Sequence, residues 1–486
     1  MIKVSKQFIE FGFVNAAILA AMVVYLILRF GYLNEQIPLW YTLPWGQDQL
    51  AVKSSIFVIP IVAILITIGG FVAAMISKKE FMQYAQEGAL TTVTGINLIL
   101  GVSLLRIILI ASKPFPPLVD PTYLKLVMPF LIGFLLVYVA TPVFIRFAKK
   151  HSIVTDPQIH QHPGMLLEKP SARGGGVVFT AAFVLTSIIF VVVSKEIAAI
   201  LFAALTAALI GLFDDIANTN PRSRLKLFGN PVFRLLVLQP IAVSFVIFAG
   251  IRINAIAGSF VLNSFIVNAG SVALAPISVA ITFLWVLWVI NMLSFSNGVD
   301  GQYSGIVGIA FIVVALLSIR FAGLTPAQLD IARLAAVAAG ASIGLTKYTW
   351  HPSQIMWGFS ATAAGMILAT LSILTGAKVA TAMIVLLIPF LDAVITVFKR
   401  IVQKKPPWQG DKGHLHHLLL ERGWSIKKIA GFYWVSTAIL GIVALIASEK
   451  HVLLVVLILT GGVAFILISL NLQSMLRKQA QQLLEK

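Results

Sequence analysis

The sequence contains no cysteine, and only 11% of its 486 residues are charged. The absence of cysteine excludes disulfides, thiolate catalysis and cysteine-ligated metal sites. A soluble domain carries roughly 25% charged residues, whereas here 59% of all residues are hydrophobic. Together with a mean hydropathy of +0.96, this composition excludes a soluble protein and indicates an integral membrane protein.

Acidic residues are scarce as well, since 18 Asp and Glu stand against 36 Lys and Arg, a formal net charge of +18. In a membrane protein such an excess is typical of cytoplasmic loops, which lie next to anionic lipid. Nucleic-acid binding would require a basic stripe with interleaved aromatic residues, and the sequence has none. We therefore expect the lipid bilayer, and not nucleic acid, as the partner of this charge.

Long apolar runs predict the fold, because a spanning helix needs roughly 20 apolar residues. Runs near this length indicate about fourteen helices and an all-α, polytopic transmembrane bundle. These runs lie at 8–30, 54–77, 91–112, 125–147, 175–194, 197–213, 232–250, 273–293, 303–319, 331–346, 355–376, 379–398, 429–447 and 452–472.

The Lys/Arg bias predicts the orientation of these helices. If residues 1–7 are inside, alternation places the most basic loops, such as 148–174 and 399–428, on the same side. We therefore expect a multi-pass protein of the inner (cytoplasmic) membrane with its active face in the cytoplasm. A Pro-rich break near residue 118 predicts an N-terminal extension of three helices, 1–118, and a part of eleven helices, 119–486.

Polar motifs cluster on the predicted inside face. Asp214 and Asp215 end a hydrophobic run, where adjacent carboxylates are costly unless they are solvated, paired or metal-bound. Mg²⁺ typically takes one or two carboxylates and completes its shell with water and substrate phosphates. Arg173 and Lys226 lie in neighbouring inside loops and are suited to phosphate contacts. A solvated helix end with basic membrane anchors remains the alternative.

A second motif runs from Asn291 to Gly301 and contains Asn297 and Asp300. Its Asn-Gly and Asp-Gly pairs are turn formers, so a tight connection between helices is one interpretation. The number of amide and acid groups favours a polar cavity instead, because polar groups at membrane depth usually line one.

A third motif places His414, His416 and His417 within four positions of a strongly basic loop. A zinc site is the alternative, but no carboxylate or cysteine completes an obvious ligand spacing. Anion recognition by the imidazoles and nearby lysines fits better. Asp392 falls inside the run 379–398, where an ionisable residue indicates pairing or function. Combined, the three motifs predict a site for Mg²⁺ and a diphosphate.

The acid pair, the Asn-rich turn, Asp392 and the His-x-His-His loop together resemble the polyprenyl-phosphate N-acetylhexosamine-1-phosphate transferases. The resemblance covers roughly residues 120–475 and leaves the first three helices unexplained. It implies transfer of a sugar 1-phosphate from a UDP-sugar to polyprenyl phosphate, with release of UMP, in cell-envelope glycan synthesis. It also implies Mg²⁺, or Mn²⁺ as the alternative, and leaves a homodimer open.

The resemblance assigns roles to residues of this sequence. Asp214, Asp215 and Asp300 would be catalytic, and the first two would also hold the metal. The histidine motif matches a segment expected to contact the donor phosphates. The residues implied to bind substrate are Asn291, Asn297, Lys226, Arg173, His414, His416 and His417. The spelling of the histidine motif is closer to the N-acetylglucosamine-type branch, with the muramoyl-pentapeptide branch as the alternative.

Two positions depart from the family pattern. Asn297 stands where the turn has an aspartate, and Phe359 stands where an aspartate binds Mg²⁺. A phenyl ring cannot coordinate a hard cation, which requires oxygen ligands. Three hypotheses follow: an active transferase, a catalytically impaired member that binds lipid phosphate or nucleotide sugar or scaffolds envelope assembly, and a transporter.

Overall fold

The protein is described by a computed structural model, which divides it into two compact units, Met1–Asp120 and Pro121–Lys486. The structure describes residues 6–40, 43, 46–76, 82–113, 121–158, 167, 169–220, 223–253, 255–257, 260–261, 275–320, 325–375, 378–408, 413–447 and 451–484. The predicted Pro-rich boundary at 114–120 lies outside these residues.

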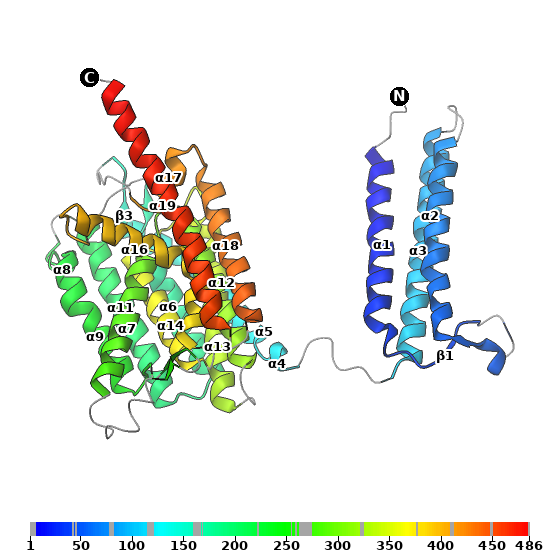
Figure 1. The fold of residues 1–486 in the computed structure, drawn as a ribbon, viewed down its shortest axis with the longest axis horizontal. Coiled ribbons are helices and arrows are strands. Elements are labelled where there is room, and N and C mark those ends of the chain that lie inside the picture. The colour runs from blue at the N-terminus through cyan, green and yellow to red at the C-terminus, as the bar shows by residue number, and fades with distance from the viewer. Residues whose placement is uncertain are drawn as a thin grey trace. The chain divides into compact units, whose positions relative to one another are not determined.

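The N-terminal unit consists of three long apolar helices and a small hairpin (Figure 1). Leu26 and Ile108 are fully buried in its core. Strands β1 and β2 pair antiparallel. The elements are α1 (Lys6–Phe30), β1 (Gln36–Pro38), η1 (Gln47–Gln49), β2 (Leu50–Val52), η2 (Lys53–Phe57), α2 (Val58–Ile76) and α3 (Met82–Ala111).

A polar network joins the three helices of this unit. The Asn97 amide donates to Asn15 Oδ1 at 2.8 Å and to Thr67 Oγ1 at 2.7 Å. Asn15 in turn donates to Thr94 Oγ1 at 2.8 Å. Asn15 and Asn97 are fully buried. Side-chain hydrogen bonds of this kind join helices in an apolar environment, so the network specifies how these three helices pair.

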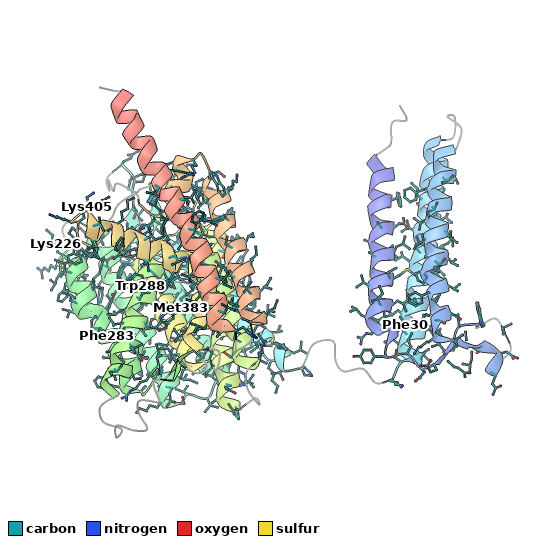
Figure 2. All side chains as sticks on the ribbon, in the orientation of Figure 1. Phe30, Lys226, Phe283, Trp288, Met383 and Lys405 are labelled. Carbon is teal, nitrogen blue, oxygen red and sulfur yellow. The ribbon has the colours of Figure 1, made fainter. Side chains whose placement is uncertain are left out.

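The second unit is a larger helical bundle with two minor hairpins. Side chains fill the interior of both units, as Figure 2 shows. The elements are α4 (Pro121–Leu124), α5 (Val127–Lys150), β3 (Val154–Thr155), β4 (Ser171–Ala172), α6 (Gly175–Phe190), α7 (Lys195–Thr219), α8 (Pro231–Phe233), η3 (Arg234–Leu238), α9 (Gln239–Phe248), β5 (Ala255–Ala257), β6 (Phe260–Val261), α11 (Ala275–Phe295), α12 (Gln302–Arg320), α13 (Pro326–Thr349), η4 (Phe359–Ala361), α14 (Thr362–Leu374), α15 (Lys378–Val385), α16 (Leu387–Val402), α17 (Leu415–Glu421), α18 (Ile426–Ile446) and α19 (Val452–Leu484).

Helix α13 lies in the core of this unit and packs closely on α5. A Cβ atom at Gly133 would lie 2.6 Å from the Val337 carbonyl oxygen, and one at Gly340 would overlap the carbonyl of Phe130. Small residues let helix backbones approach in this way. The resulting van der Waals contacts hold helices together in lipid, where the hydrophobic effect does not drive their association. The Gly- and Ala-rich sequence of α13 therefore positions the helices around it.

The all-α polytopic fold predicted from the sequence is confirmed. Among the described residues, ten helices are long and apolar enough to cross a membrane, or eleven if a sharply bent pair counts as one span. Three shorter apolar helices, Val14–Phe30, Gly175–Phe190 and Phe359–Leu374, coincide with further predicted runs. The chain is thus a multi-pass membrane protein with helices at the fourteen predicted places.

The predicted run 379–398 is helical but sharply bent. Helix α15 ends at Val385, α16 begins at Leu387, and the two are bent by 86°. The cause is Pro389, whose ring clashes with the carbonyl group four residues earlier and which lacks an N–H donor. Asp392 consequently lies on α16, beyond the bend, and is not in the middle of a straight span.

Candidate functional site

The predicted motifs meet where several helices of the second unit end. The acid pair lies in the last turns of α7, the Asn-rich turn follows α11, and the histidines surround the start of α17. The turn at η4, which precedes α14, contacts the first two of these segments. Figure 1 shows β3 and α17 at the same end of this unit. The convergence expected from the sequence is therefore built by four separate segments.

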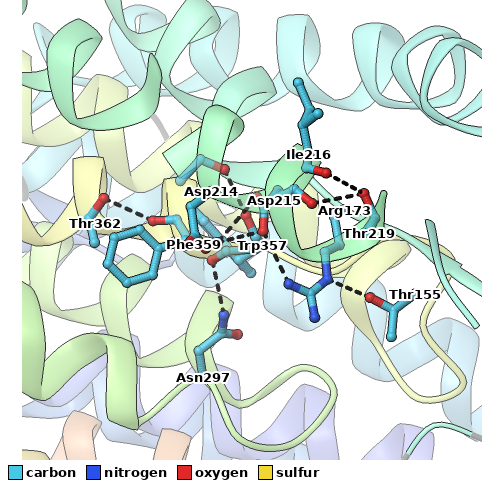
Figure 3. A network of polar contacts seen from close by, with 12 residues as sticks. Thr155, Arg173, Asp214, Asp215, Ile216, Thr219, Asn297, Trp357, Phe359 and Thr362 are labelled. Carbon is cyan, nitrogen blue, oxygen red and sulfur yellow. Dashed lines mark hydrogen bonds and ion pairs between the residues drawn. The ribbon is translucent and has the colours of Figure 1, made fainter. Parts of the chain in front are cut away.

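Asp215 is completely buried and has two partners. The backbone N–H of Phe359 donates to both carboxylate oxygens, at 3.0 and 3.2 Å. Arg173 Nη1 lies 3.4 Å from Asp215 Oδ1, and its Nε donates to the Thr155 hydroxyl, as Figure 3 shows. The carboxylate is thus held between a helix N-terminus and a guanidinium.

Glycines make this approach of backbone to carboxylate possible. Gly358 has a φ of 67°, and a Cβ atom there would overlap the Asp215 carboxylate. A Cβ at Gly211 or Gly176 would overlap the backbone at Ser360. Only glycine combines a left-handed backbone with the absence of a side chain, so the turn before α14 is pressed directly against α6 and α7.

Asp214 is also buried, and its ion-pair partner is Arg234. Arg234 reaches it from η3, a π-helical segment of five residues between α8 and α9. The guanidinium also lies over the ring of Phe359, 3.9 Å from the ring centre. Arg234 was not among the predicted site residues, although a charged residue near the start of the run 232–250 was a usable signal.

Asp300 does not share the partners of the acid pair. Its Oδ2 atom lies 2.9 Å from His351 Nδ1 and accepts a hydrogen bond from the Ser353 N–H at 3.1 Å. Both partners lie in the loop between α13 and η4. In this structure Asp300 therefore positions the loop that leads to Phe359, and its assignment as a catalytic residue stays a prediction.

The two asparagines occupy different places. Asn297 Nδ2 lies 3.5 Å from the Gly358 carbonyl oxygen, so this side chain reaches the turn beside Asp215. Asn291 exchanges amide hydrogen bonds with Gln239 of α9, at 2.9 and 3.3 Å. Asn291 therefore joins α11 to α9, and Gln239 is a second polar residue that sequence analysis missed.

The three histidines are buried and lie next to one another. The rings of His414 and His416 stack at 5.7 Å, and those of His416 and His417 lie 4.3 Å apart. A Cβ at Gly298 would overlap the His416 ring, so the Asn-rich turn packs directly on this cluster. Burial, and then the two neighbouring histidines, hold the pKa of His416 well below its ordinary value of 6.5.

Asp392 fixes the orientation of the first histidine. Its Oδ2 atom lies 2.9 Å from His414 Nδ1, and its Oδ1 atom accepts from the Leu415 N–H at 2.7 Å. Arg400 Nη2 lies 3.3 Å from His414 Nε2. A donor at Nε2 and a carboxylate at Nδ1 together favour the tautomer with its proton on Nδ1. The pairing role expected for Asp392 is thus present in the structure.

Lys226 stands apart from these contacts. It is exposed in the turn after α7, and Figure 2 labels it at the edge of the unit. No hydrogen bond or ion pair joins its side chain to another residue in the part of the chain that the structure describes. Its predicted contact with substrate phosphate stays a prediction.

The acid pair does not fit a divalent cation. Each carboxylate already faces a guanidinium, and the turn before α14 offers the ring and N–H of Phe359 where a carboxylate oxygen is needed. Mg²⁺ requires a near-octahedral set of oxygens. Among the described residues, no group of three or more His, Cys, Asp or Glu side chains could hold a metal.

Comparisons with known proteins agree with the motifs. Residues 197–376 match the family model described as glycosyl transferase family 4. A probable undecaprenyl-phosphate N-acetylglucosaminyl 1-phosphate transferase of Bacillus subtilis is 23% identical over 317 residues, 63% of this chain and 81% of that protein. A phospho-N-acetylmuramoyl-pentapeptide-transferase of Clostridioides difficile is 24% identical over 332 residues, 65% of this chain and 96% of that protein.

A second phospho-N-acetylmuramoyl-pentapeptide-transferase, of Staphylococcus haemolyticus, is 26% identical over 337 residues, 66% of this chain and 98% of that protein. Each match spans most of the relative but only about two thirds of this chain. The resemblance inferred from the acid pair, the Asn-rich turn and the histidines is therefore confirmed, because the chain is similar both to glycosyl transferase family 4 and to these sugar-phosphate transferases.

Proposed function

We propose that the unit Pro121–Lys486 transfers a sugar 1-phosphate of the N-acetylhexosamine type from a UDP-sugar to polyprenyl phosphate, at the cytoplasmic face of the inner membrane. The names of the relatives support this substrate pair and a place in cell-envelope glycan synthesis. The observation that carries the proposal is the convergence of four segments. Phe359 donates its N–H to Asp215, and Asn297 reaches the Gly358 carbonyl beside it. Gly298, the residue after Asn297, packs on the His416 ring.

The reaction joins two phosphates. A phosphate oxygen of the polyprenyl phosphate attacks the β-phosphorus of the UDP-sugar, a new P–O bond forms, and the bond to the UMP oxygen breaks. Such a reaction depends mostly on positioning and on neutralising charge in the transition state. In this chain the guanidinium groups beside the acid pair are those of Arg173 and Arg234, each paired with one carboxylate, and Lys226 lies exposed after α7. Burial lowers the pKa of His416, which favours the uncharged form of this imidazole.

One observation favours a second function, binding of the same ligands without transfer. The ring of Phe359 stands where the family has a metal-binding carboxylate, and Arg234 covers it at 3.9 Å. A protein with this arrangement would hold a lipid phosphate or a nucleotide sugar, or scaffold envelope assembly, without releasing UMP. Both functions use the same site, so they differ in turnover and not in location.

UMP release decides between the two functions. Membranes containing the full chain would be supplied with polyprenyl phosphate and a panel of donors, including UDP-N-acetylglucosamine and UDP-N-acetylmuramoyl-pentapeptide. Release of UMP above the level of an Asp215→Asn variant, with one donor preferred, would support transfer and identify the branch. No release from any donor, together with saturable binding of polyprenyl phosphate, would reject transfer and support binding alone.

A further inference from the structure

The two ion pairs of the site share an asymmetry of exposure. The Asp214 and Asp215 side chains are 3% and 0% exposed, whereas those of Arg234 and Arg173 are 17% and 23% exposed. In each pair the acid is covered and the arginine is the partner that remains accessible. The accessible groups on this face are therefore the two guanidinium groups, which repel a cation. The same groups attract an anion, and guanidinium binds phosphate through paired hydrogen bonds.

The positions of the two arginines are specified by the fold. Arg234 opens the π-helical segment, a local irregularity that often occurs at functional sites, and it is stacked on Phe359. Arg173 precedes Gly174, which has a φ of 100°, and is anchored on Thr155 of the β3–β4 pair. A cation over an aromatic ring is attracted by the negative face of the ring, and more strongly when it is desolvated. Phe359 thus supports a guanidinium in the place where an aspartate would support a metal.

Charge balance gives the same result. Two carboxylates and two guanidinium groups sum to zero, so the acid pair has no residual negative charge to attract a divalent ion. Addition of such an ion would bring it close to two fixed positive charges in a region of low dielectric, where repulsion is strong.

We propose that Arg234, seated on Phe359 and paired with Asp214, replaces the divalent cation of the family, and that this chain binds the phosphate of its ligand through arginines without Mg²⁺. The proposal rests on the proposed function for the identity of the ligand. The shared ligand chemistry is a phosphate or diphosphate group, which either polyprenyl phosphate or a UDP-sugar would supply.

The first test measures metal binding directly on the purified full chain. Free Mn²⁺ would be followed by electron paramagnetic resonance during titration of the native protein, of Phe359→Asp/Arg234→Gln, and of the matched control Phe359→Leu. We expect no saturable Mn²⁺ uptake by the native chain or the control, and stoichiometric uptake by the double variant. Stoichiometric uptake by the native chain that Asp215→Asn abolishes would overturn the proposal. If the double variant does not fold, the native titration decides alone.

The second test measures ligand binding in excess EDTA, in separate arms with undecaprenyl phosphate and with UDP-N-acetylglucosamine. For whichever of the two ligands binds, we expect EDTA to leave the affinity unchanged and Arg234→Gln to lower it at least tenfold. Binding that EDTA abolishes and Mg²⁺ restores would overturn the proposal. The arms also identify whether the lipid phosphate or the nucleotide sugar is the ligand.

These tests separate the inference from the proposed function. UMP release that persists in EDTA supports both. Absence of UMP release, together with EDTA-resistant binding and no Mn²⁺ uptake, rejects transfer and leaves the metal-free site standing. UMP release that strictly requires Mg²⁺ supports transfer and rejects the metal-free site.

Discussion

The two units of this protein treat buried polar groups differently. In the N-terminal unit, the buried amides of Asn15 and Asn97 bond to each other and to the half-buried hydroxyls of Thr67 and Thr94, so this network consists of neutral groups. In the second unit each buried carboxylate of the site is paired with a partly exposed arginine.

The difference separates a structural network from a functional one. A hydrogen bond between neutral side chains in lipid contributes about 0.6–2 kcal/mol, which is sufficient to specify helix pairing. A buried ion pair costs several kcal/mol in desolvation for each ion and is therefore weak evidence for stability. We infer that the hydrogen bonds of the N-terminal unit hold its three helices together. The Asp–Arg pairs of the second unit serve instead to position arginines for a ligand.

The largest effect is expected for Arg234→Gln. Removal of the guanidinium leaves the Asp214 carboxylate buried without its ion-pair partner, which costs about 3–5 kcal/mol. Thermal unfolding of the purified chain in detergent would measure the loss. Arg224→Gln is the matched control, because Arg224 is an exposed arginine in the turn after α7. Equal unfolding midpoints for Arg234→Gln and Arg224→Gln would show that the buried ion pair is not distinct in its effect on stability.

A smaller effect is expected for Asn97→Ala. The substitution breaks the link between α1, α2 and α3 at a cost of about 1–2 kcal/mol and leaves the second unit's ligand binding unchanged. Unfolding and phosphate-ligand binding would be measured on the same preparation. Thr92→Ala is the control, since this exposed hydroxyl bonds only to Gly88 of its own helix. Loss of ligand binding in Asn97→Ala would show that the N-terminal network is not purely structural.

A pH-dependent effect is expected from His416. Its pKa in the folded protein lies below the ordinary 6.5, so the unfolded chain binds the proton more readily. Stability is therefore fully present above pH 6.5 and is lost as the pH falls below that value toward the folded pKa. Unfolding midpoints between pH 7.5 and about 5 would fall in the native chain, and less steeply in His416→Gln. A matching reduction of slope in His151→Gln, an exposed histidine, would contradict this assignment.

The smallest effect is expected for Lys226→Gln. Surface substitutions of this kind usually change stability by less than about 0.5 kcal/mol, and Lys226 is exposed. Its contribution would appear only in ligand affinity, as a modest loss that high salt also produces in the native chain. An affinity that is unaffected at every ionic strength would remove Lys226 from the binding residues.

Much of the fold could be predicted because the apolar runs are long and the loops between them are short and polar. Hydropathy does not indicate where a helix axis changes direction, however, so the bend between Val385 and Leu387 could not be predicted from the run 379–398. Its cause, Pro389, was present in the sequence, but a proline in a membrane helix is tolerated in many places.

Most residues of the site could be predicted from the sequence, but the partners of their side chains could not. The acid pair, Asn297 and the histidines do come together, because each lies at the end of a helix on the same side. The partners of the acids could not be predicted, since Arg234 lies 20 residues from Asp214 and Phe359 lies 144 residues from Asp215. Such contacts depend on tertiary packing, and no local pattern indicates them.

The glycine-lined turn before α14 has a consequence for how this site could change over evolutionary time. Gly176 and Gly211 hold the backbone near Ser360, and Gly358 holds it against Asp215, so the path of the chain does not depend on the side chain at position 359. An aromatic residue and an acidic residue can therefore replace one another at position 359 without a change in the backbone. Gain or loss of metal chemistry in such a lineage would then be a matter of a few side chains, and the fold would preserve no trace of the switch.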